Sequence, residues 1–524
     1  MRQLRLAFIR ARRVTWSRVR ARAAAAIVSL AVLATFAACG SHVGGAAEGD
    51  ASGAGSNVGF GGEQDFAYFR TQLENGIVPH PDVLQASGFF AEHHTPMPAP
   101  ECGGALCIHP LLGVAPDILG GPARHVLQLA INTPIELDPE DRPDLDLTLS
   151  IDVSGSMSAD NRMGYVRSGL DLMLDELYDD DQIAIVIYSS DASVLLPMTR
   201  VGDAREDIGG TIRDLSAGGM TALYAGLELA YQHAREHQTA DRESRVIMLS
   251  DGEANVGPSS NDAILGMSRE YNVEGIGLTT IGLGDSFNVD LMRGLAEQGD
   301  GNYYYVGNAA DVQDVFTTEV HSFTVPVARD VVVDVAQGRS YRFAQAWGSP
   351  RWEDLDDGGV LDLPAVFAAH RKSHDDTTDP GGRRGGGSAL LLELEPRTDV
   401  ADDLETAHVA SILFSYTDPE LGERVEQQIE VDLPHHPHEV PKEGHFAPTP
   451  KVIMKSFAML HAYLALKQGC TLYHDGHSED ALDLLAGARD RLLTLEARLN
   501  DGDGDEDIQR DITIIEKLED AIAL

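Results

Sequence analysis

The feature that most constrains the fold is a regular alternation of short apolar strands and amphipathic helices between residues 143 and 323. The expected strands are Leu145–Ile151, Gln182–Ser189, Arg245–Ser250, Gly277–Leu283 and Tyr303–Val306. The expected helices are Met163–Tyr178, Ala204–Leu215, Thr221–His237, Asn261–Tyr271, Val289–Gln298 and Ala310–Phe323. Strands that are apolar on both faces and separated by helices indicate a parallel sheet covered on both sides. We therefore predict an α/β fold with a doubly wound, mostly parallel, Rossmann-like sheet.

Five oxygen-bearing side chains follow the expected strands or open the expected helices of this region. Asp152, Ser154 and Ser156 come directly after the first strand, Thr221 follows a Gly-rich loop, and Asp251 ends a later strand. The carboxyl ends of parallel strands share one edge of the sheet, where ligands bind. Oxygen ligands without Cys or His suit a hard divalent cation such as Mg²⁺. The alternative is that these residues serve only as turn and cap residues.

The Asp152-x-Ser154-x-Ser156 motif, with Thr221 and Asp251 downstream, resembles the metal-ion-dependent adhesion site of the von Willebrand factor type A family. The resemblance implies that the three hydroxyls ligate Mg²⁺ (or Ca²⁺ or Mn²⁺) and that the two aspartates hold its waters. It also implies that a carboxylate of a protein partner completes the coordination. Residues 63–520 further resemble a bacterial, lipoprotein-type subgroup in which the metal domain is flanked by N- and C-terminal segments, and Thr279–Gly284 and Gly301–Tyr305 fit that group.

The flanking regions have different sequence patterns from the alternating region. Period-two patterns over residues 324–434 predict a β-rich, sandwich-like accessory domain, and residues 451–524 predict helices. The predicted organisation is a signal peptide (1–39), a flexible Gly/Ala/Ser linker (40–62), an N-terminal accessory segment (63–142), the metal domain (143–323), the β-rich accessory domain (324–434), a linker (435–450) and the C-terminal helices (451–524).

The first 39 residues have the pattern of an export signal. Residues 1–38 carry eight arginines and no acidic residue, and an apolar stretch precedes Cys39. Small residues directly before a cysteine resemble a bacterial lipoprotein signal, which implies lipidation of Cys39 and, with Gly40 following, an outer-membrane destination. Phe36 departs from the leucine usual at that position. The alternatives are an uncleaved membrane anchor and a conventional signal peptide.

The remaining cysteines indicate the compartment, and the overall charge indicates which classes of partner are favoured. Cys102 and Cys107 are predicted to form a disulfide in an oxidising compartment, and Cys470 is predicted to be a buried free thiol. The formal net charge of −43 disfavours nucleic acid and favours cations and basic partners. Histidines near residues 435–445 and the acidic run over residues 501–507 are weaker metal candidates, and capping of the next helix is the preferred interpretation of the acidic run.

Taken together, these patterns predict a binding protein of the cell envelope rather than an enzyme. The expected partner is a protein that offers an Asp or Glu; contact with the membrane is expected only through the N-terminal lipid, and no small-molecule substrate is expected. The main alternative is an envelope scaffold or assembly factor with a purely structural metal. A hydrolase is less favoured because no His or Lys is placed by pattern to activate Ser154, and a channel-associated protein is less favoured because no mature segment is apolar over a length that could cross a bilayer.

Overall fold

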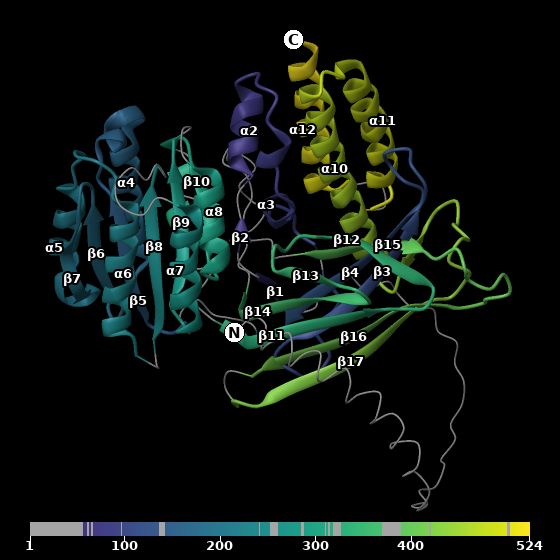
Figure 1. Cartoon of the computed structure of the whole chain (residues 1–524), viewed down its shortest axis with the longest axis horizontal. Coiled ribbons are helices and arrows are strands. Elements are labelled where there is room, and N and C mark those ends of the chain that lie inside the picture. The colour runs from purple at the N-terminus through teal and green to yellow at the C-terminus, as the bar shows by residue number, and fades with distance from the viewer. Residues whose placement is uncertain are drawn as a thin grey trace, which may run out of the picture. The chain divides into compact units, whose positions relative to one another are not determined.

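The computed structural model describes a seven-stranded sheet in the order β2-β10-β9-β8-β5-β6-β7 (Figure 1). It describes residues 56–59, 62–63, 66–95, 97–135, 142–239, 242–251, 260–284, 288–309, 311–312, 315–317, 326–368, 389–418, 421–499 and 504–524. The strands of this sheet are β2 (Gly62–Glu63), β5 (Leu145–Asp152), β6 (Gln182–Tyr188), β7 (Ala192–Arg200), β8 (Glu243–Ser250), β9 (Gly277–Leu283) and β10 (Asn302–Val306). All pairings are parallel except that of β6 with β7.

Helices cover both faces of this sheet, which confirms the doubly wound fold. The helices are α4 (Arg162–Glu176), α5 (Val201–Arg213), α6 (Leu223–His237), α7 (Asn261–Val273) and α8 (Val289–Gln298). Neighbouring residues of one strand enter opposite cores, as β6 shows: Ile185 packs with α4 and α5, and Val186 packs with α6, α7 and α8. The helix expected over Ala310–Phe323 lies partly outside the described residues. Neither β2 nor β7 was expected, and β2 begins at residue 62, which was predicted to belong to the flexible linker.

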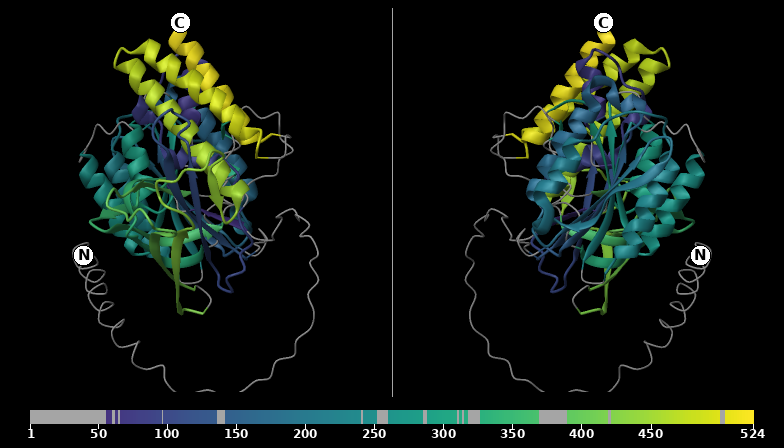
Figure 2. Two further views of the ribbon diagram at one scale, coloured as in Figure 1. Left: turned by 90° about the vertical axis from the view of Figure 1, so that its right-hand side faces the viewer. Right: turned by 90° about the vertical axis from the view of Figure 1, so that its left-hand side faces the viewer.

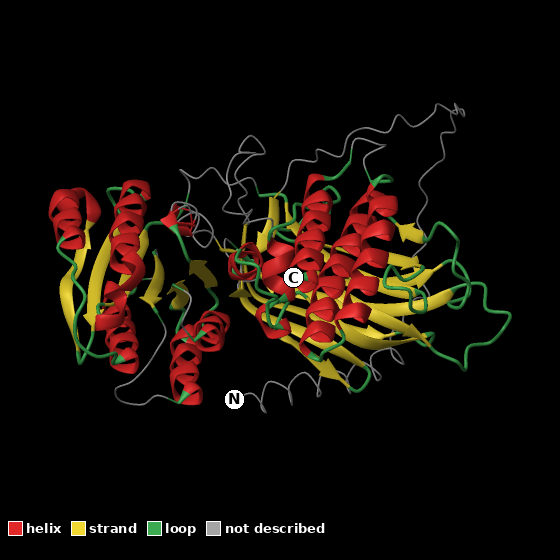
Figure 3. Cartoon of the chain, turned by 90° about the horizontal axis from the view of Figure 1, so that it is seen from above, coloured by secondary structure: helices red, strands yellow, loops and turns green. Residues whose placement is uncertain are grey.

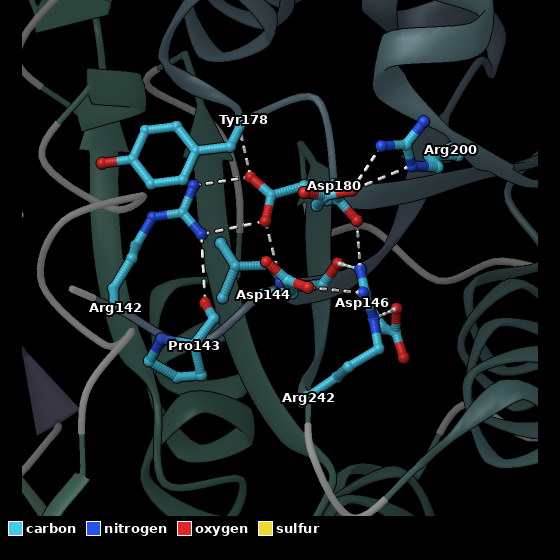
Figure 4. Close-up of polar contacts among 10 residues, drawn as sticks. Arg142, Pro143, Asp144, Asp146, Tyr178, Asp180, Arg200 and Arg242 are labelled. Atoms are coloured by element: carbon cyan, nitrogen blue, oxygen red, sulfur yellow. Dashed lines mark hydrogen bonds and ion pairs between the residues drawn. The ribbon is translucent and has the colours of Figure 1, made fainter. Parts of the chain in front are cut away.

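Arginine–aspartate pairs close the amino-terminal edge of the sheet (Figure 4). The Arg142 guanidinium donates to both oxygens of Asp181, at 2.9 and 2.5 Å, and lies 3.9 Å from the ring centre of Tyr178. Arg142 and Asp181 have exposed side-chain fractions of 1% and 0%. Arg242 donates to Asp146 at 2.6 Å and to Asp144 at 3.0 Å. Buried carboxylates at this edge are therefore paired within the chain.

A second, eleven-stranded sheet has the path β12-β15-β4-β1-β14-β11-β16-β17, with β3, β13 and β18 attached at its sides. Its strands are β1 (Ser56–Gly59), β3 (Cys107–Ala115), β4 (Arg124–Thr133), β11 (Pro326–Gln337), β12 (Tyr341–Trp347), β13 (Trp352–Leu355), β14 (Gly358–Ala368), β15 (Leu390–Pro396), β16 (Ala407–Thr417), β17 (Arg424–Leu433) and β18 (His445–Ala447). One apolar core includes side chains of β3, β4 and β15 together with side chains of β11, β14 and β16. Strands from residues 107–133 and from residues 326–433 thus form one β-rich unit.

Helices pack against the outer side of β3, β4 and β15. Leu390 and Leu392 belong to the apolar core of the large sheet described above. Leu391 belongs instead to a second core, which it shares with α10 and other helices. That core contains α2 (Ala67–Glu74), α3 (Ala86–Ala91), α10 (Pro450–His474), α11 (Ser478–Glu496) and α12 (Glu506–Ala523). The three C-terminal helices, yellow-green to yellow, lie side by side in both views of Figure 2, and Figure 3 shows them over the strands. Among the described helices, none combines the length and apolar character needed to cross a membrane.

The two sheets are connected through the start of the described chain and through arginine side chains. Within residues 56–63, β1 pairs with β4 and β14 of the large sheet, and β2 pairs with β10 of the seven-stranded sheet. Arg351, which precedes β13, forms an ion pair with Asp300 and donates to the carbonyl of Glu297 at 2.8 Å. Arg245 donates to the carbonyl of Asp300 at 2.9 Å and lies 5.5 Å from the ring centre of Phe367.

Candidate metal centre

Asp152 lies at the carboxyl-terminal edge of the seven-stranded sheet, where β5 ends. Its side chain is fully buried, with an exposed fraction of 0%. One carboxylate oxygen accepts the Ser154 backbone N–H at 2.8 Å, and the other accepts the Ser250 hydroxyl at 2.8 Å. These two hydrogen bonds fix the carboxylate between the ends of the neighbouring strands β5 and β8.

Two serine hydroxyls lie together just beyond Asp152. The Ser154 and Ser156 Oγ atoms are 3.0 Å apart, with Ser154 buried and Ser156 exposed. A short 3₁₀ segment, η3 (Gly155–Asn161), places them there, and its Met157 is fully buried beneath the turn. The pair therefore leads from the buried carboxylate to the surface.

Backbone hydrogen bonds bring the Thr221 loop to the same edge. Gly155 N–H donates to the carbonyl of Gly219 at 3.1 Å, and Gly218 N–H donates to the carbonyl of Val153 at 2.7 Å. Gly219 has a φ of +92°, and a Cβ there would lie 3.0 Å from the Ser189 hydroxyl, so glycine suits this position. Thr221 follows with an exposed fraction of 3%.

Asp251 follows β8 and is also buried, with an exposed fraction of 2%. One of its oxygens accepts the Arg162 guanidinium at 3.1 Å, and the other has no hydrogen-bond partner among the described residues. A buried carboxylate oxygen without a donor is costly, so this atom is available to a cation or to a water that a cation holds.

The electrostatics of this edge favour a cation. Burial raises the pKa of Asp152 to about 6, and the nearby negative charge of Asp251 adds to that effect. The hydrogen bonds from Ser154 and Ser250 oppose it. Two buried carboxylates, two adjacent hydroxyls and one unsatisfied oxygen therefore match the donor set of a hard divalent ion.

Arg162 was not predicted from the sequence. It begins α4, its side chain is 8% exposed, and it bonds to Asp251 and lies 3.5 Å from Asp160. The left-handed residues Asp160 (φ 47°) and Asn161 (φ 61°) turn the chain before α4 and so decide where Arg162 points. No spacing or motif in the sequence could have indicated this contact.

The other predicted site residues lie elsewhere. Cys39 lies outside the described residues. Cys102 and Cys107 form a disulfide, and Cys470 is buried in α10. Among the described residues, no group of three or more His, Cys, Asp or Glu side chains could hold a metal, which gives the histidines near residues 435–445 no support. Ser154, Ser156 and Thr221 carry hydroxyl oxygens, a different class of metal ligand.

Comparisons with known proteins agree with this geometry. Residues 146–318 match the von Willebrand factor type A domain. The uncharacterized protein YfbK of Escherichia coli strain K12 is 35% identical over 209 residues, which cover 40% of this chain and 35% of YfbK. The matched region thus spans about a third of that relative.

Solved structures of low sequence identity are also similar. A von Willebrand factor type A protein from Catenulispora acidiphila has a TM-score of 0.49 at 13% identity and covers 79% of this chain and 89% of its own. Proximal thread matrix protein 1 from the mussel byssus, with a zinc-occupied metal-ion-dependent adhesion site, has a TM-score of 0.30 at 18% identity and covers 34% and 48%. The sheet order, the helices on both faces and the family match together identify residues 146–318 as a von Willebrand factor type A domain.

Proposed function

We propose that the protein binds a divalent cation at the carboxyl-terminal edge of the seven-stranded sheet and, through that cation, an acidic group of a protein partner. The observation that carries the proposal is the pair of buried carboxylates, Asp152 and Asp251, beside two hydroxyls and with an oxygen left unsatisfied. Ser154, Ser156 and Thr221 would hold the ion through hydroxyls, and the two aspartates would orient its waters. The ion would supply an electrophilic centre at the protein surface.

The charge balance of the site favours an external anion. Arg162 compensates one of the two carboxylates, so a divalent ion would leave an excess positive charge at this edge. Neutral hydroxyls in contact with the ion do not reduce that charge. A carboxylate from a partner would reduce it, whereas a neutral peptide group would not.

Binding rather than catalysis is proposed because of the surroundings of the two serines. Among the described residues, neither the Ser154 nor the Ser156 hydroxyl bonds to a histidine or a lysine that could act as a base. Both hydroxyls are instead placed where they could serve as neutral oxygen ligands of a cation.

Calorimetric titration of Mg²⁺ into metal-free protein tests the cation site. We expect a saturable heat for the wild type and at least a tenfold weaker affinity for Thr221→Ala. Thr211→Ala is the matched control, because among the described residues the Thr211 hydroxyl donates only to the carbonyl of Asp207, at 2.9 Å, within α5. Equal heats for wild type and Thr221→Ala would contradict the proposal. Parallel titrations with Ca²⁺, Mn²⁺ and Zn²⁺ would identify the preferred ion.

The partner is tested by affinity capture from envelope extract in Mg²⁺ and again in chelator. We expect proteins that are retained with Mg²⁺ and released by chelator, and that are not retained by Thr221→Ala. If retention were the same in chelator, the metal would be structural and the protein would act as a scaffold.

We also propose export and anchoring through a lipid on Cys39. The support is the arginine-rich, then apolar sequence before that cysteine. Mass spectrometry of the mature N-terminus tests this proposal, and Cys39→Ser should move the protein from the membrane fraction to the soluble fraction. A wild-type chain without a lipid would contradict it.

A further inference from the structure

A cavity of about 330 Å³ lies between α2, the end of α3 and α12, outside the von Willebrand factor type A domain. Its lining brings together residues 70–93 and 507–517, and α2 and α12 lie side by side in Figure 1. The volume is at the lower end of the range for small-molecule sites. The charges of its lining decide what such a site could hold.

Four acidic side chains line the cavity, and three of them have a cation beside them. Arg70 forms an ion pair with Glu92, and Lys517 lies 3.4 Å from Glu74. Asp507 accepts Lys455 at 2.7 Å, and the same ammonium lies 2.9 Å from Asp505, which caps the start of α12. The negative charges of these three carboxylates are therefore largely balanced by neighbouring cations.

The fourth acid, Asp511, forms a buried pair with His93. The Nδ1 atom of His93 lies 2.8 Å from the carbonyl of Phe89, which can only accept, so Nδ1 carries a proton. Nε2 lies 2.9 Å from an Asp511 oxygen, so the contact also needs a proton, on either the imidazole or the carboxyl group. Burial raises the pKa of Asp511, and the pair is neutral whichever group holds the proton.

Arg510 is the exception in this balanced lining. It is partly buried, and it makes no hydrogen bond or ion pair with any residue that the structure describes. This holds even though the chain has a formal net charge of −43. A guanidinium carries five N–H donors in a planar fork that matches a carboxylate, so the cavity presents an unfilled anion-binding group.

We propose that this cavity binds a small monocarboxylate, with Arg510 holding its carboxylate group. A monoanion matches the single uncompensated charge of Arg510, whereas a dianion such as phosphate would bring one negative charge more than the lining balances. Ile514 also lines it and offers apolar contact to the carbon part of the ligand. The carboxylate could belong to a free organic acid or to the C-terminus of a peptide.

Titrations monitored by NMR, in chelator so that the metal centre plays no part, test this site. The probes are N-acetyl-leucine, the tripeptide Gly-Gly-Leu and the amide of each. Wild type should bind the carboxylates saturably and the amides at least tenfold more weakly. Arg510→Gln should weaken carboxylate binding at least tenfold, and Arg510→Lys should weaken it less.

Arg339→Gln is the matched control, because Arg339 is an exposed arginine between β11 and β12 and also has no hydrogen bond or ion pair to the described residues. It should leave the affinity unchanged. Tighter binding of the tripeptide would identify a peptide terminus, and tighter binding of N-acetyl-leucine would identify a free acid; both agree with the proposal. The absence of saturable binding, equal affinity for amides, or wild-type affinity in Arg510→Gln would overturn it.

Discussion

The two edges of the seven-stranded sheet use the same residue type in opposite ways. At the amino-terminal edge, Asp181 is buried and both of its oxygens accept the Arg142 guanidinium. At the carboxyl-terminal edge, Asp152 and Asp251 are similarly buried, and among the described residues an arginine, Arg162, pairs with Asp251 but not with Asp152. The first arrangement is electrically complete within the chain. The second is incomplete, and this difference supports the cation site proposed above.

The largest effect on stability should come from removing the buried Arg142–Asp181 ion pair at the amino-terminal edge. Arg142→Ala leaves the Asp181 carboxylate buried without its counter-charge and removes the contact with the Tyr178 ring. We expect a loss of about 3–5 kcal/mol in the free energy of unfolding. Urea unfolding measures it, and a loss below about 1 kcal/mol would mean that water compensates Asp181 and that this edge is not closed.

Aspartate to asparagine at the two edges should give opposite signs. In chelator the folded-state pKa of Asp152, about 6, exceeds the value of about 3.9 in an unfolded chain, so its ionisation destabilises the fold. The stability of metal-free protein should therefore fall as pH rises from about 4 to about 6, by at most about 3 kcal/mol. Asp152→Asn should remove this pH dependence and stabilise the metal-free protein at pH 8.

Asp181→Asn should destabilise the protein at the same pH. All four donors around that carboxylate, two from Arg142 and the backbone N–H groups of Leu145 and Tyr178, need acceptors. An amide NH₂ cannot accept, so we expect a loss of about 2–4 kcal/mol. Thermal unfolding of both variants in chelator measures whether each substitution stabilises or destabilises the protein. A change in the same direction for both would contradict the contrast between the edges.

Arg162→Gln should strengthen cation binding. Removing the positive charge beside Asp251 makes the site more negative, so the Mg²⁺ affinity should rise about tenfold, equivalent to about 1.4 kcal/mol. Arg200→Gln, at the opposite edge, should leave that affinity unchanged. A weaker Mg²⁺ affinity in Arg162→Gln would show instead that Arg162 acts mainly by holding Asp251 in position.

The smallest effect should come from the exposed part of the closed edge. Arg200 pairs with Asp180 and Asp203 there, and its side chain is 44% exposed. Arg200→Ala should lower the free energy of unfolding only slightly at low salt and leave it unchanged within error at high salt, because solvent and salt screen exposed ion pairs. Urea unfolding at low and high salt measures this change. A large loss would show that the arginine–aspartate network of this edge contributes to stability even at its exposed residues.

The sequence predicted most of the seven-stranded sheet because its strands are apolar on both faces. It did not predict β7, which carries Pro197 and is largely exposed, so neither an apolar run nor a clean alternation marks it. It also did not show that β4 pairs with β15, because Val126 and Glu393 are opposite each other only through long-range pairing. The Leu390–Leu392 run indicated a buried strand, but no local pattern identifies its neighbours.

For the candidate metal centre, the sequence predicted that the motif residues lie at one edge, because the strand ends of a parallel sheet share that edge; that they ligate a metal stays a prediction. The structure brings Asp152, Ser154 and Ser156 together and links the Thr221 loop to them by backbone hydrogen bonds. Arg162 could not be predicted, because its direction depends on two left-handed residues whose conformation the sequence does not reveal. The lack of a partner for Arg510 among the described residues could not be predicted either, because it depends on which residues the folded chain brings near it.

The strands β1 and β2 have a mechanical consequence. Within eight residues the chain pairs with both sheets, through β1 to β4 and β14 and through β2 to β10. Tension applied to the chain ahead of Ser56 would first load the β1 ladder and Val58, which is fully buried in the core of the large sheet. If the chain is anchored ahead of this segment, as proposed, a pull on the seven-stranded sheet would reach the anchor through β2 and β1.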